Sequence, residues 1–450
     1  MNNKTYKTKE EIFKRAQEAI GIPLKNIDKT NRLSTGKGAI GSVLEESWFN
    51  YKPNSDSNPD FTEAGIELKA APYTRTKSGI RAKERLVCNI INYMDEYKHD
   101  FYDSSFMRKC ANILLMSYEH KMNVPKGEFS IDKVTLFSFP EEDLLIIKND
   151  WNTIVDKIKA GKAHEISEGD TLYLGACTKG KNSQSTREQP FSDIPAKQRA
   201  FSLKQSYMTY ILNNYIFGNQ TDEKVIKSLD DLNSNSFENI ITAKIKPFLG
   251  MSQMELCNRF KLQSNAKNIN ELLISKMLNL RGHISQTEEF KKANIVPKTI
   301  RVNNDGSITE HMSFPIFKFK EIINENWETS SFKTLLEQTK FLFLVFKYNA
   351  KNELIFNDIL FWNMPEDDLD EVRIVWEKTV SIIKEGIQIR KSNGRNYNNL
   401  PKSTESRIAH VRPHARNSSD TLELPDGRQF PKQCFWLNNN YIKEQLEKIK

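Results

Sequence analysis

The chain has 450 residues, and 66 Lys and Arg against 58 Asp and Glu give it a formal net charge of +8 at pH 7. This length is enough for two or three domains with their own cores, and the mild basic excess favours polyanionic partners without defining a site. The five scattered cysteines form no C-x-x-C pair, which argues against zinc sites and disulfides and favours free thiols.

The N-terminus is polar and contains no apolar core of a signal peptide. The longest apolar runs, such as 341–346, have the length of a strand and are too short to span a membrane. We therefore expect a soluble, cytoplasmic protein that has no membrane partner.

The first motif along the chain is a glycine cluster, in which Gly36, Gly38 and Gly41 satisfy G-x-G-x-x-G. This pattern indicates a dinucleotide site only directly after a buried strand, and the preceding residues 25–35 are mostly polar. No G-x-x-x-x-G-K-[ST] pattern of a P-loop stands nearby. We expect the cluster to begin a helix, with the glycines allowing close backbone approach.

The second motif places two carboxylates and a lysine in the order that metal-dependent DNA cleavage requires. Asp60 follows a proline, and Glu67 and Lys69 alternate with apolar residues, which predicts a strand with both charged side chains on one side. Carboxylate oxygens suit Mg²⁺, which lowers the pKa of an attacking water, and a lysine steadies charge in the transition state. The alternative is an amphipathic edge strand with solvated charges, which is the common case for an isolated E-x-K.

The surroundings of this motif extend the pattern in a fixed order. It runs from a K-G-x-x-G helix start through an acidic residue, an aspartate and E-L-K to a lysine that opens the next apolar strand: Gly41, Glu45, Asp60, Glu67–Lys69 and Lys83. In this order the chain resembles the mismatch-repair endonuclease MutH and the GATC-cutting type II restriction endonucleases built on its fold. The resemblance continues through 150–151, 169–174 and 200–204, and so covers roughly residues 10–215.

Residue by residue, the resemblance implies a catalytic core with two accessory residues: Asp60, Glu67 and Lys69, with Glu45 and Lys83. It further implies that Asp60 and Glu67 hold Mg²⁺. Glu46 is the alternative to Glu45, because this chain has one extra residue before Trp48 compared with its closest restriction-enzyme relatives.

Internal repetition is the next feature, and it needs no outside comparison. Residues 139–144 recur as 364–369, and the segment from Trp151 to Gly161 recurs as Trp376 to Gly386, at an offset of 225 (376 minus 151). Residues 200–207 correspond to 434–441 at an offset of 234 (434 minus 200). Two unrelated helices that share a tryptophan and a glycine stop are the alternative. The ordered matches favour two copies of one fold, since the period far exceeds that of repeat arrays.

We therefore predict an α/β protein made by tandem duplication of a restriction-endonuclease-like fold, of the PD-(D/E)xK, MutH type, with a mixed central sheet. The predicted domains are a catalytic domain at 1–217, a linker at 218–236 and a second domain at 237–450. The predicted strands are 65–72, 84–93 and 133–138 in the first copy, and 339–348 and 354–362 in the second.

The second copy has lost the catalytic pair in this alignment. A shift of about 229 positions moves the catalytic strand onto 294–302, where Val296 replaces the glutamate and Lys298 retains the lysine. Glu289 stands where the aspartate is expected, and one carboxylate cannot hold a metal as two do. We expect this catalytically degenerate domain to bind DNA as an allosteric module.

Basic loops supply the predicted DNA contacts. Residues 171–210 contain six Lys or Arg against two acids, and residues 388–440 contain nine against four. Cations mixed with short polar side chains are typical of phosphate and base-edge contacts, although such runs often only solvate a surface. The predicted contacts are Thr178, Lys179, Lys181, Arg187 and Lys204 in the first copy, and His410, Arg412, His414 and Arg416 in the second. A metal site at the two histidines is the alternative, but no further ligand stands nearby.

The resemblance implies a type II restriction endonuclease that cuts double-stranded DNA at GATC, 5′ of the guanine, with Mg²⁺ and with 5′ overhangs. Two alternatives stay open: a MutH-like nicking repair endonuclease and a non-catalytic DNA-binding regulatory protein. We expect the C-terminal domain to bind a second DNA site as effector, whereas a dimer induced by DNA and the response to methylation are left open by the sequence.

Overall fold

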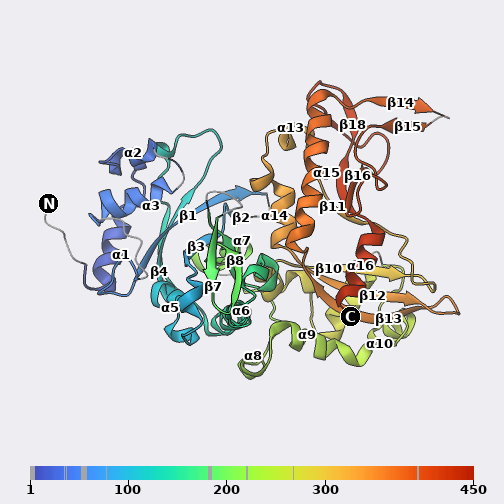
Figure 1. Cartoon of the computed structure of the whole chain (residues 1–450), viewed down its shortest axis with the longest axis horizontal. Helices are drawn as coiled ribbons and strands as arrows, with labels where there is room; N and C mark the ends of the chain where they lie inside the picture. Colours follow the sequence, from blue (N-terminus) through green and yellow to red (C-terminus); the bar gives the residue numbers. More distant parts are fainter. Residues whose placement is uncertain are drawn as a thin grey trace. The chain divides into compact units, whose positions relative to one another are not determined.

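The computed structural model describes residues 6–34, 36, 38–51, 58–77, 79–180, 185–218, 221–266, 268–392 and 395–449. The chain divides into two compact units (Figure 1). Unit 1 comprises Met1–Ile240 and Gln286–Asn294, and unit 2 comprises Ile241–Ser285 and Ile295–Lys450. Both contain helices and mixed sheets, as the sequence predicts. In the described residues, no helix is both long and apolar enough to cross a membrane.

Unit 1 is built on a four-stranded sheet with the strand order β2-β1-β4-β5. The strands are β1 (Glu67–Thr76), β2 (Gly79–Ala82), β4 (Asn112–Glu119) and β5 (Lys133–Ser138). β1 and β4 are parallel, whereas β2 and β5 run antiparallel to their neighbours. One apolar cluster joins β1 and β4 to the helices α1 (Lys9–Gln17), α2 (Leu24–Ile27) and α3 (Ala39–Val43).

A second, antiparallel sheet of unit 1 has the order β3-β9-β6. A separate two-stranded hairpin lies between β6 and β9 along the chain. The strands of the sheet are β3 (Leu86–Ile90), β6 (Leu174–Thr178) and β9 (Arg199–Leu203), and the hairpin is β7 (Thr186–Gln189) with β8 (Ser192–Lys197). The remaining helices are α4 (Tyr93–Glu96), α5 (Ser105–Cys110), α6 (Glu141–Lys159), α7 (Gln205–Tyr210) with the π-turn η7 (Ile211–Ile216), α8 (Leu229–Ser234) and α12 (Glu288–Ala293).

Helix α6 shows how local sequence fixes these elements. Pro140 precedes it, three acidic residues occupy its first turn, two lysines occupy its last turn, and Gly161 follows with a φ of 69°. Acids at the start and bases at the end complement the helix dipole, and a glycine adopts the left-handed conformation without steric cost. Trp151 and its apolar neighbours on one side of the helix are buried. The corresponding helix of unit 2, α15 (Glu366–Glu385), has the same signals, from Pro365 to Gly386.

Unit 2 contains a sheet with the order β10-β12-β13, where β10 and β12 are parallel and β13 is antiparallel. A second sheet has the order β11-β19-β16. The elements are α10 (Gln253–Phe260), α11 (Ile269–Met277), β10 (Ile295–Val302), β11 (Met312–Ile316), α13 (Phe319–Ile322), α14 (Ser331–Gln338), β12 (Lys340–Tyr348), β13 (Leu354–Trp362), β14 (Ile389–Ser392), β15 (Arg395–Asn398), β16 (Ala409–Pro413), β17 (Thr421–Glu423), β18 (Gln429–Pro431), β19 (Gln433–Leu437) and α16 (Asn439–Ile449). Helix α9 (Phe237–Ile245) carries the chain from unit 1 into unit 2.

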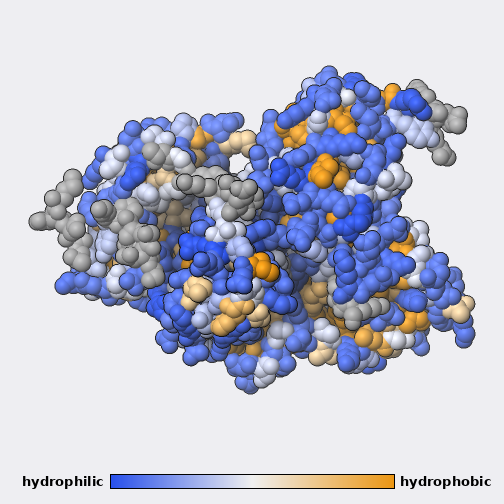
Figure 2. All heavy atoms as spheres, viewed as in Figure 1, coloured by the Kyte–Doolittle hydropathy of each residue, from blue (hydrophilic) through white to orange (hydrophobic). Residues whose placement is uncertain are grey.

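The segment 218–236, which the sequence predicts to be a linker, contains buried apolar residues and a helix. Val225, Ile226 and Leu232 are buried, and α8 forms within it. These apolar residues stand singly among polar ones, so the composition hides how firmly the segment packs into unit 1. The face shown in Figure 2 is mostly hydrophilic, with hydrophobic residues in small separate patches.

Candidate active site

A tight turn brings the two predicted carboxylates together across seven residues. Phe61 and Ile66 form an antiparallel bridge, and Gly65 between them has a φ of 64°. The ring of Phe61 packs edge-on against Tyr6, Phe49 and Tyr51, which anchors the turn in the core. The bridge therefore folds the chain back so that Asp60 stands beside the first residue of β1, Glu67.

Hydrogen bonds fix the two carboxylates in this place. The N–H of Asp60 donates to Glu67 Oε2 at 3.1 Å, and the N–H of Leu68 donates to Asp60 Oδ2 at 2.9 Å. Glu67 is only 2% exposed. Burial raises the pKa of Glu67, and the neighbouring Asp60 charge acts in the same direction against the opposing effect of Lys69.

Lys69 shares this side of β1 with Glu67. Its Nζ donates to Glu67 Oε1 at 2.7 Å, two positions along the strand, as the alternation of side chains requires. Burial opposes the charge of Lys69, but Glu67 and the buried thiols of Cys110 and Cys88 outweigh it and raise the lysine pKa above its usual value. The ammonium group is therefore held protonated next to the carboxylates.

The structure separates the two candidate accessory glutamates. Both lie in the π-turn η2 (Leu44–Trp48), an element frequent at functional sites. Glu46 turns outward and pairs with Arg32 at 2.6 Å. Burial and the nearby charge of Asp60 raise the pKa of Glu45 to about 7, with Glu67 adding to the effect. The side chain that joins the carboxylates is therefore that of Glu45.

The sequence predicts Lys83 as the accessory lysine, and the structure shows a further lysine, Lys109, beside Glu67. Lys83 is exposed after β2. Burial of His120 lowers the pKa of that histidine, and the charge of Lys83 adds to the effect. Lys109, near the end of α5, is almost fully buried, and its Nζ lies 3.7 Å from Glu67 Oε1. Lys109 stands 42 residues from Glu67 on a separate helix (109 minus 67), so no local pattern in the sequence could have identified it.

The donor set of this site fits a divalent cation. In the part of the chain that the structure describes, no three His, Cys, Asp or Glu side chains stand at metal-binding spacing. Asp60 and Glu67 nevertheless supply hard oxygens of the kind that Mg²⁺ prefers. Burial first, and then neighbouring negative charge, raise the pKa values of Glu45 and Glu67, and a divalent cation would neutralise that charge.

The predicted DNA contacts of unit 1 divide into two groups. Thr178, Lys179 and Arg187 are exposed at the end of β6 and on the β7–β8 hairpin, whereas Lys181 lies outside the described residues. Lys204 is only 3% exposed, and its Nζ donates to the carbonyl oxygens of Glu168 and Thr171. Lys204 therefore ties down the preceding loop instead of presenting a charge to DNA.

The predicted DNA contacts of unit 2 show the same division. Arg412 is exposed with its guanidinium 5.1 Å from the ring centre of Trp436, and the ring of His414 packs against the same indole at a tilt of 51°. Arg416 is exposed as well. His410 is only 3% exposed and its Nδ1 lies 2.6 Å from Asn438 Oδ1, so it belongs to the interior and not to a DNA-contacting surface.

The strand of unit 2 that the sequence predicts to correspond to β1 is β10. Val296 and Lys298 both lie on it, and Lys298 Nζ donates to the carbonyl of Ser313 at 3.3 Å. Glu289 lies on α12, in unit 1, where its carboxylate accepts the N–H groups of Val225 and Ile226. Glu289 therefore has a structural part in unit 1 and does not face Val296 in place of an aspartate.

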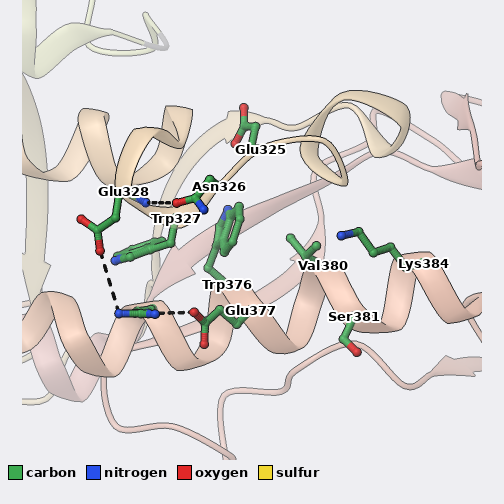
Figure 3. A pocket seen from close by; sticks show the side chains of 10 residues that line it. Glu325, Asn326, Trp327, Glu328, Trp376, Glu377, Val380, Ser381 and Lys384 are labelled. Carbon is green, nitrogen blue, oxygen red and sulfur yellow. Dashed lines mark hydrogen bonds and ion pairs between the residues drawn. The ribbon is translucent and has the colours of Figure 1, made fainter. Parts of the chain in front are cut away.

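Unit 2 also has a cavity of about 330 Å³ between α15 and the turn that precedes α14 (Figure 3). Trp327 and Trp376 pack together in it with ring centres 5.7 Å apart. The buried indole Nε1 of Trp376 has no partner among the described residues, whereas the indole of Trp151 in unit 1 donates to Glu96 at 2.7 Å. Charged side chains also line this cavity, among them Arg373, which pairs with Glu377 at 2.7 Å.

Known proteins resemble this chain in two ways. Residues 49–150 match the family model described as DNA mismatch repair enzyme MutH. The type II restriction enzyme Sau3AI of Staphylococcus aureus is 38% identical over 99% of both chains. The DNA mismatch repair proteins MutH of Vibrio vulnificus and Shewanella oneidensis are 27% and 25% identical, over 46% of this chain and 93% and 95% of theirs.

A mixed sheet with an aspartate, a glutamate and a lysine gathered at one end of its central parallel strand is the arrangement of a metal-dependent nuclease. The full-length similarity goes further than this class. The chain belongs to the MutH-related type II restriction enzymes, which are site-specific deoxyribonucleases.

Proposed function

We propose that this protein hydrolyses double-stranded DNA at GATC, 5′ of the guanine, with Mg²⁺ as cofactor and with 5′ overhangs as the product. The observation that carries the proposal is the joined set of Asp60, Glu67 and Lys69, with Glu67 Oε1 2.7 Å from Lys69 Nζ. The choice of GATC and of the cut position rests on the resemblance to the GATC-cutting enzymes of this fold.

In the proposed chemistry, different side chains of unit 1 bind the metal, orient the phosphate and transfer protons. Asp60 and Glu67 would hold Mg²⁺, which supplies charge neutralisation and a lower pKa for a bound water. Lys69 and Lys109 bring positive charge to Glu67 from two sides, at 2.7 and 3.7 Å. In this position they orient a phosphate and stabilise the charge that develops on its oxygens. Glu45 adds a carboxyl group beside Asp60 for proton transfer or metal binding.

Digestion of a plasmid, followed by run-off sequencing, tests activity, site and overhang together. Wild-type protein is expected to cut at GATC in Mg²⁺, to bind without cutting in Ca²⁺ and to stop in EDTA. Asp60→Ala and Glu67→Ala each remove a metal ligand, so cleavage should disappear while site-specific binding persists. Normal digestion by the Glu67→Ala protein would overturn the site.

We further propose that the chain is a tandem duplication, with a catalytic domain over 1–217, a connection over 218–236 and a second, degenerate domain over 237–450. Matching strand order and direction in β1-β4-β5 and β10-β12-β13 support this. The pairing of β3 with β9 and that of β11 with β19 support it as well. Each has one irregularity in its register, between Val87 and Ile90 in the first pair and between Ser313 and Ile316 in the second. Lys204 and Asn438 occupy corresponding positions in the proposed duplication, and the side chain of each donates to a backbone carbonyl of a loop.

The degenerate domain is proposed to bind a second DNA site and to raise cleavage by the first. Val296 at the position of Glu67 supports the loss of catalysis. The exposed Arg412, His414 and Arg416 support DNA binding, and the indole of Trp436 under the Arg412 guanidinium would hold that cation in place. Binding at one site can favour the active state at another only if the two states differ in affinity for DNA.

A further inference from the structure

Helix α12 interrupts unit 2 in sequence yet belongs to unit 1. The chain leaves unit 1 after Ile240, forms 241–285 in unit 2, returns as Gln286–Asn294, and continues in unit 2 from Ile295. The catalytic unit is therefore completed by nine residues that the chain supplies from within its second half. Neither the active site nor the basic loops account for this arrangement.

Lys292 is the anchor of α12 in unit 1. It is 0% exposed, and its Nζ lies 2.6 Å from Asp143 Oδ1, 2.6 Å from Glu288 Oε1 and 3.0 Å from the hydroxyl of Tyr215. A buried ammonium group needs such partners on several sides, because its desolvation is costly. Asp143 is itself 1% exposed and lies on α6, so α12 is held by a fully desolvated ion pair.

Two neighbouring residues add contacts on either side of this anchor. The N–H groups of Val225 and Ile226 donate to the buried carboxylate of Glu289 at 3.0 and 2.8 Å. Lys291 pairs with Asp222 at 2.7 Å. Helix α12 is thus docked firmly in unit 1. A connection that only passed along the surface would not bury the charged side chains of Glu288, Glu289 and Lys292.

A chain of contacts runs from α12 to the catalytic strand within unit 1. Ser206 Oγ on α7 donates to the carbonyl of Lys292 at 2.7 Å. The adjacent Gln205 donates to the carbonyl of Ala82 on β2 at 2.7 Å, and the N–H of Ala82 donates to Thr209 on α7 at 3.1 Å. Strand β2 pairs directly with β1, which carries the catalytic Glu67 and Lys69.

There is no flexible spacer between α12 and unit 2. Asn294 ends the helix with a φ of 51°, and the next residue, Ile295, already pairs with Lys340 in the β10–β12 ladder. Any displacement of β10 therefore acts directly on α12. This strand is also the one that corresponds to the catalytic strand in the degenerate copy.

We propose that α12 and its direct junction with β10 form the element through which DNA bound by unit 2 regulates the active site of unit 1. The inference rests on the proposed effector role of the second domain. A change in β10 on DNA binding would pull α12 against α7 and so shift β2 and β1. Deletion of 240–450 cannot test this, because it also removes α12 from the catalytic unit and leaves Asp143 without its partner.

The test uses the full-length chain with four residues, Gly-Ser-Gly-Ser, inserted between Asn294 and Ile295. This insertion keeps the contacts of Lys292 and the strand register while it breaks the stiff junction. A matched control carries the same insertion between Ser264 and Asn265, in the exposed turn between α10 and α11. Initial cleavage rates on one-site and two-site plasmids are compared for all three proteins, together with their melting temperatures.

The wild type and the control insertion are expected to cut the two-site plasmid at least about fivefold faster. The insertion at 294/295 is expected to bring this ratio close to one at an unchanged one-site rate and melting temperature. Retention of the full two-site advantage by this variant would overturn the inference alone. A wild type without any two-site advantage would instead overturn the effector role on which the inference rests.

A second variant keeps the test independent of how well an insertion folds. Ser206→Ala removes the hydroxyl that bonds the Lys292 carbonyl and is expected to reduce the two-site advantage by at least twofold, on the order of 0.4 kcal/mol of coupling. Ser138→Ala, which removes a surface hydroxyl bonded to Asn112, is the matched control and is expected to retain it. Equal two-site advantages for these two variants would count against α12 as the regulating element.

Discussion

Glu67 holds its place through partners from three parts of unit 1. The N–H of Asp60 and the ammonium groups of Lys69 and Lys109 surround its carboxylate, which is nearly inaccessible to water. The two lysines oppose the effect of burial, which nevertheless raises the pKa of this carboxyl group. The same lysines face the place where a phosphate would approach this metal. Lys109, 3.7 Å from Glu67, is therefore a candidate for an accessory catalytic role beside Lys69.

The first prediction compares two candidate accessory lysines. Lys109→Ala removes a buried charge 3.7 Å from Glu67 and should lower cleavage at least about tenfold, since each 1.4 kcal/mol of lost transition-state stabilisation costs a factor of ten. Lys83→Ala should change the rate by less than about twofold, because exposed charges contribute little. Single-turnover cleavage rates, with binding in Ca²⁺ as the control for folding, distinguish them. A larger loss in the Lys83→Ala protein would return the accessory role to Lys83.

The second prediction concerns His410, whose burial lowers its pKa to about 4 against the opposing hydrogen bond to Asn438, with the charges of His311 and Arg412 assisting. The unfolded chain binds a proton at His410 near pH 6.5, and the folded chain does so only near pH 4. The folded state is therefore stabilised above pH 6.5, and this stability is lost as the pH falls from 6.5 towards 4. The loss amounts to at most about 3 kcal/mol.

Urea unfolding of wild type and His410→Asn at pH 7 and pH 5 measures this effect. The variant should lose less stability between the two pH values than the wild type does. His414→Asn is the matched control, because His414 is exposed and its change should leave the pH dependence of the wild type intact. A wild-type stability that stays constant over this interval would contradict the burial of a neutral imidazole.

At the level of elements, α12 stabilises unit 1 mainly through a buried charge network. The third prediction is that Lys292→Met destabilises unit 1 by about 3 kcal/mol or more, because Asp143 and Glu288 lose their shared partner in a desolvated place. The triple variant with Asp143→Asn and Glu288→Gln should recover much of this stability, since it leaves no buried charge unpaired. Thermal unfolding followed by calorimetry measures both, and equal destabilisation of single and triple variants would show that packing dominates.

The elements that the sequence predicts well are those with a strong local pattern. The expected strands 133–138 and 354–362 coincide with β5 and β13, and 65–72 overlaps β1, which extends to Thr76. Strand β4 was missed, although it pairs with the catalytic strand. Its residues 113–118 are all buried, so the alternation that identifies a half-exposed strand is absent.

The same limit applies to the candidate site. Asp60, Glu67 and Lys69 could be found because a short turn and one strand bring them together, and local sequence encodes both. Lys109 reaches the site only through the packing of α5, which no spacing in the sequence reveals. Lys204 and His410 are polar residues in basic loops by sequence, yet both are buried by the sheets around them. Whether a cation faces DNA or a carbonyl oxygen is decided by tertiary structure.

At the level of the whole molecule, the two units show how one strand order can support two roles. Strands β1-β4-β5 and β10-β12-β13 share order and direction, but β1 carries Glu67 where β10 carries Val296. In the proposed duplication, replacement of one buried carboxylate by valine would abolish a metal site without disturbing the sheet, because valine suits a strand well. In the proposal, the exposed Arg412 and Arg416 of the second unit serve to bind DNA.

The final prediction tests those cations. Arg412→Ala with Arg416→Ala should reduce the two-site cleavage advantage and lower the salt dependence of second-site binding by about one unit of log–log slope for each lost phosphate contact. Cleavage of a one-site substrate should change little, because the contacts of unit 1 are intact. Arg301→Ala is the matched control, since this exposed arginine of unit 2 pairs with Glu310 and not with DNA in the proposal.

Trp436→Leu should weaken the advantage as well, and Trp436→Phe should restore part of it, because a ring is needed to hold the Arg412 guanidinium. Equal two-site advantages in the Arg412/Arg416 variant and the Arg301 control would remove these residues from the DNA-binding surface and leave the second unit with a structural role.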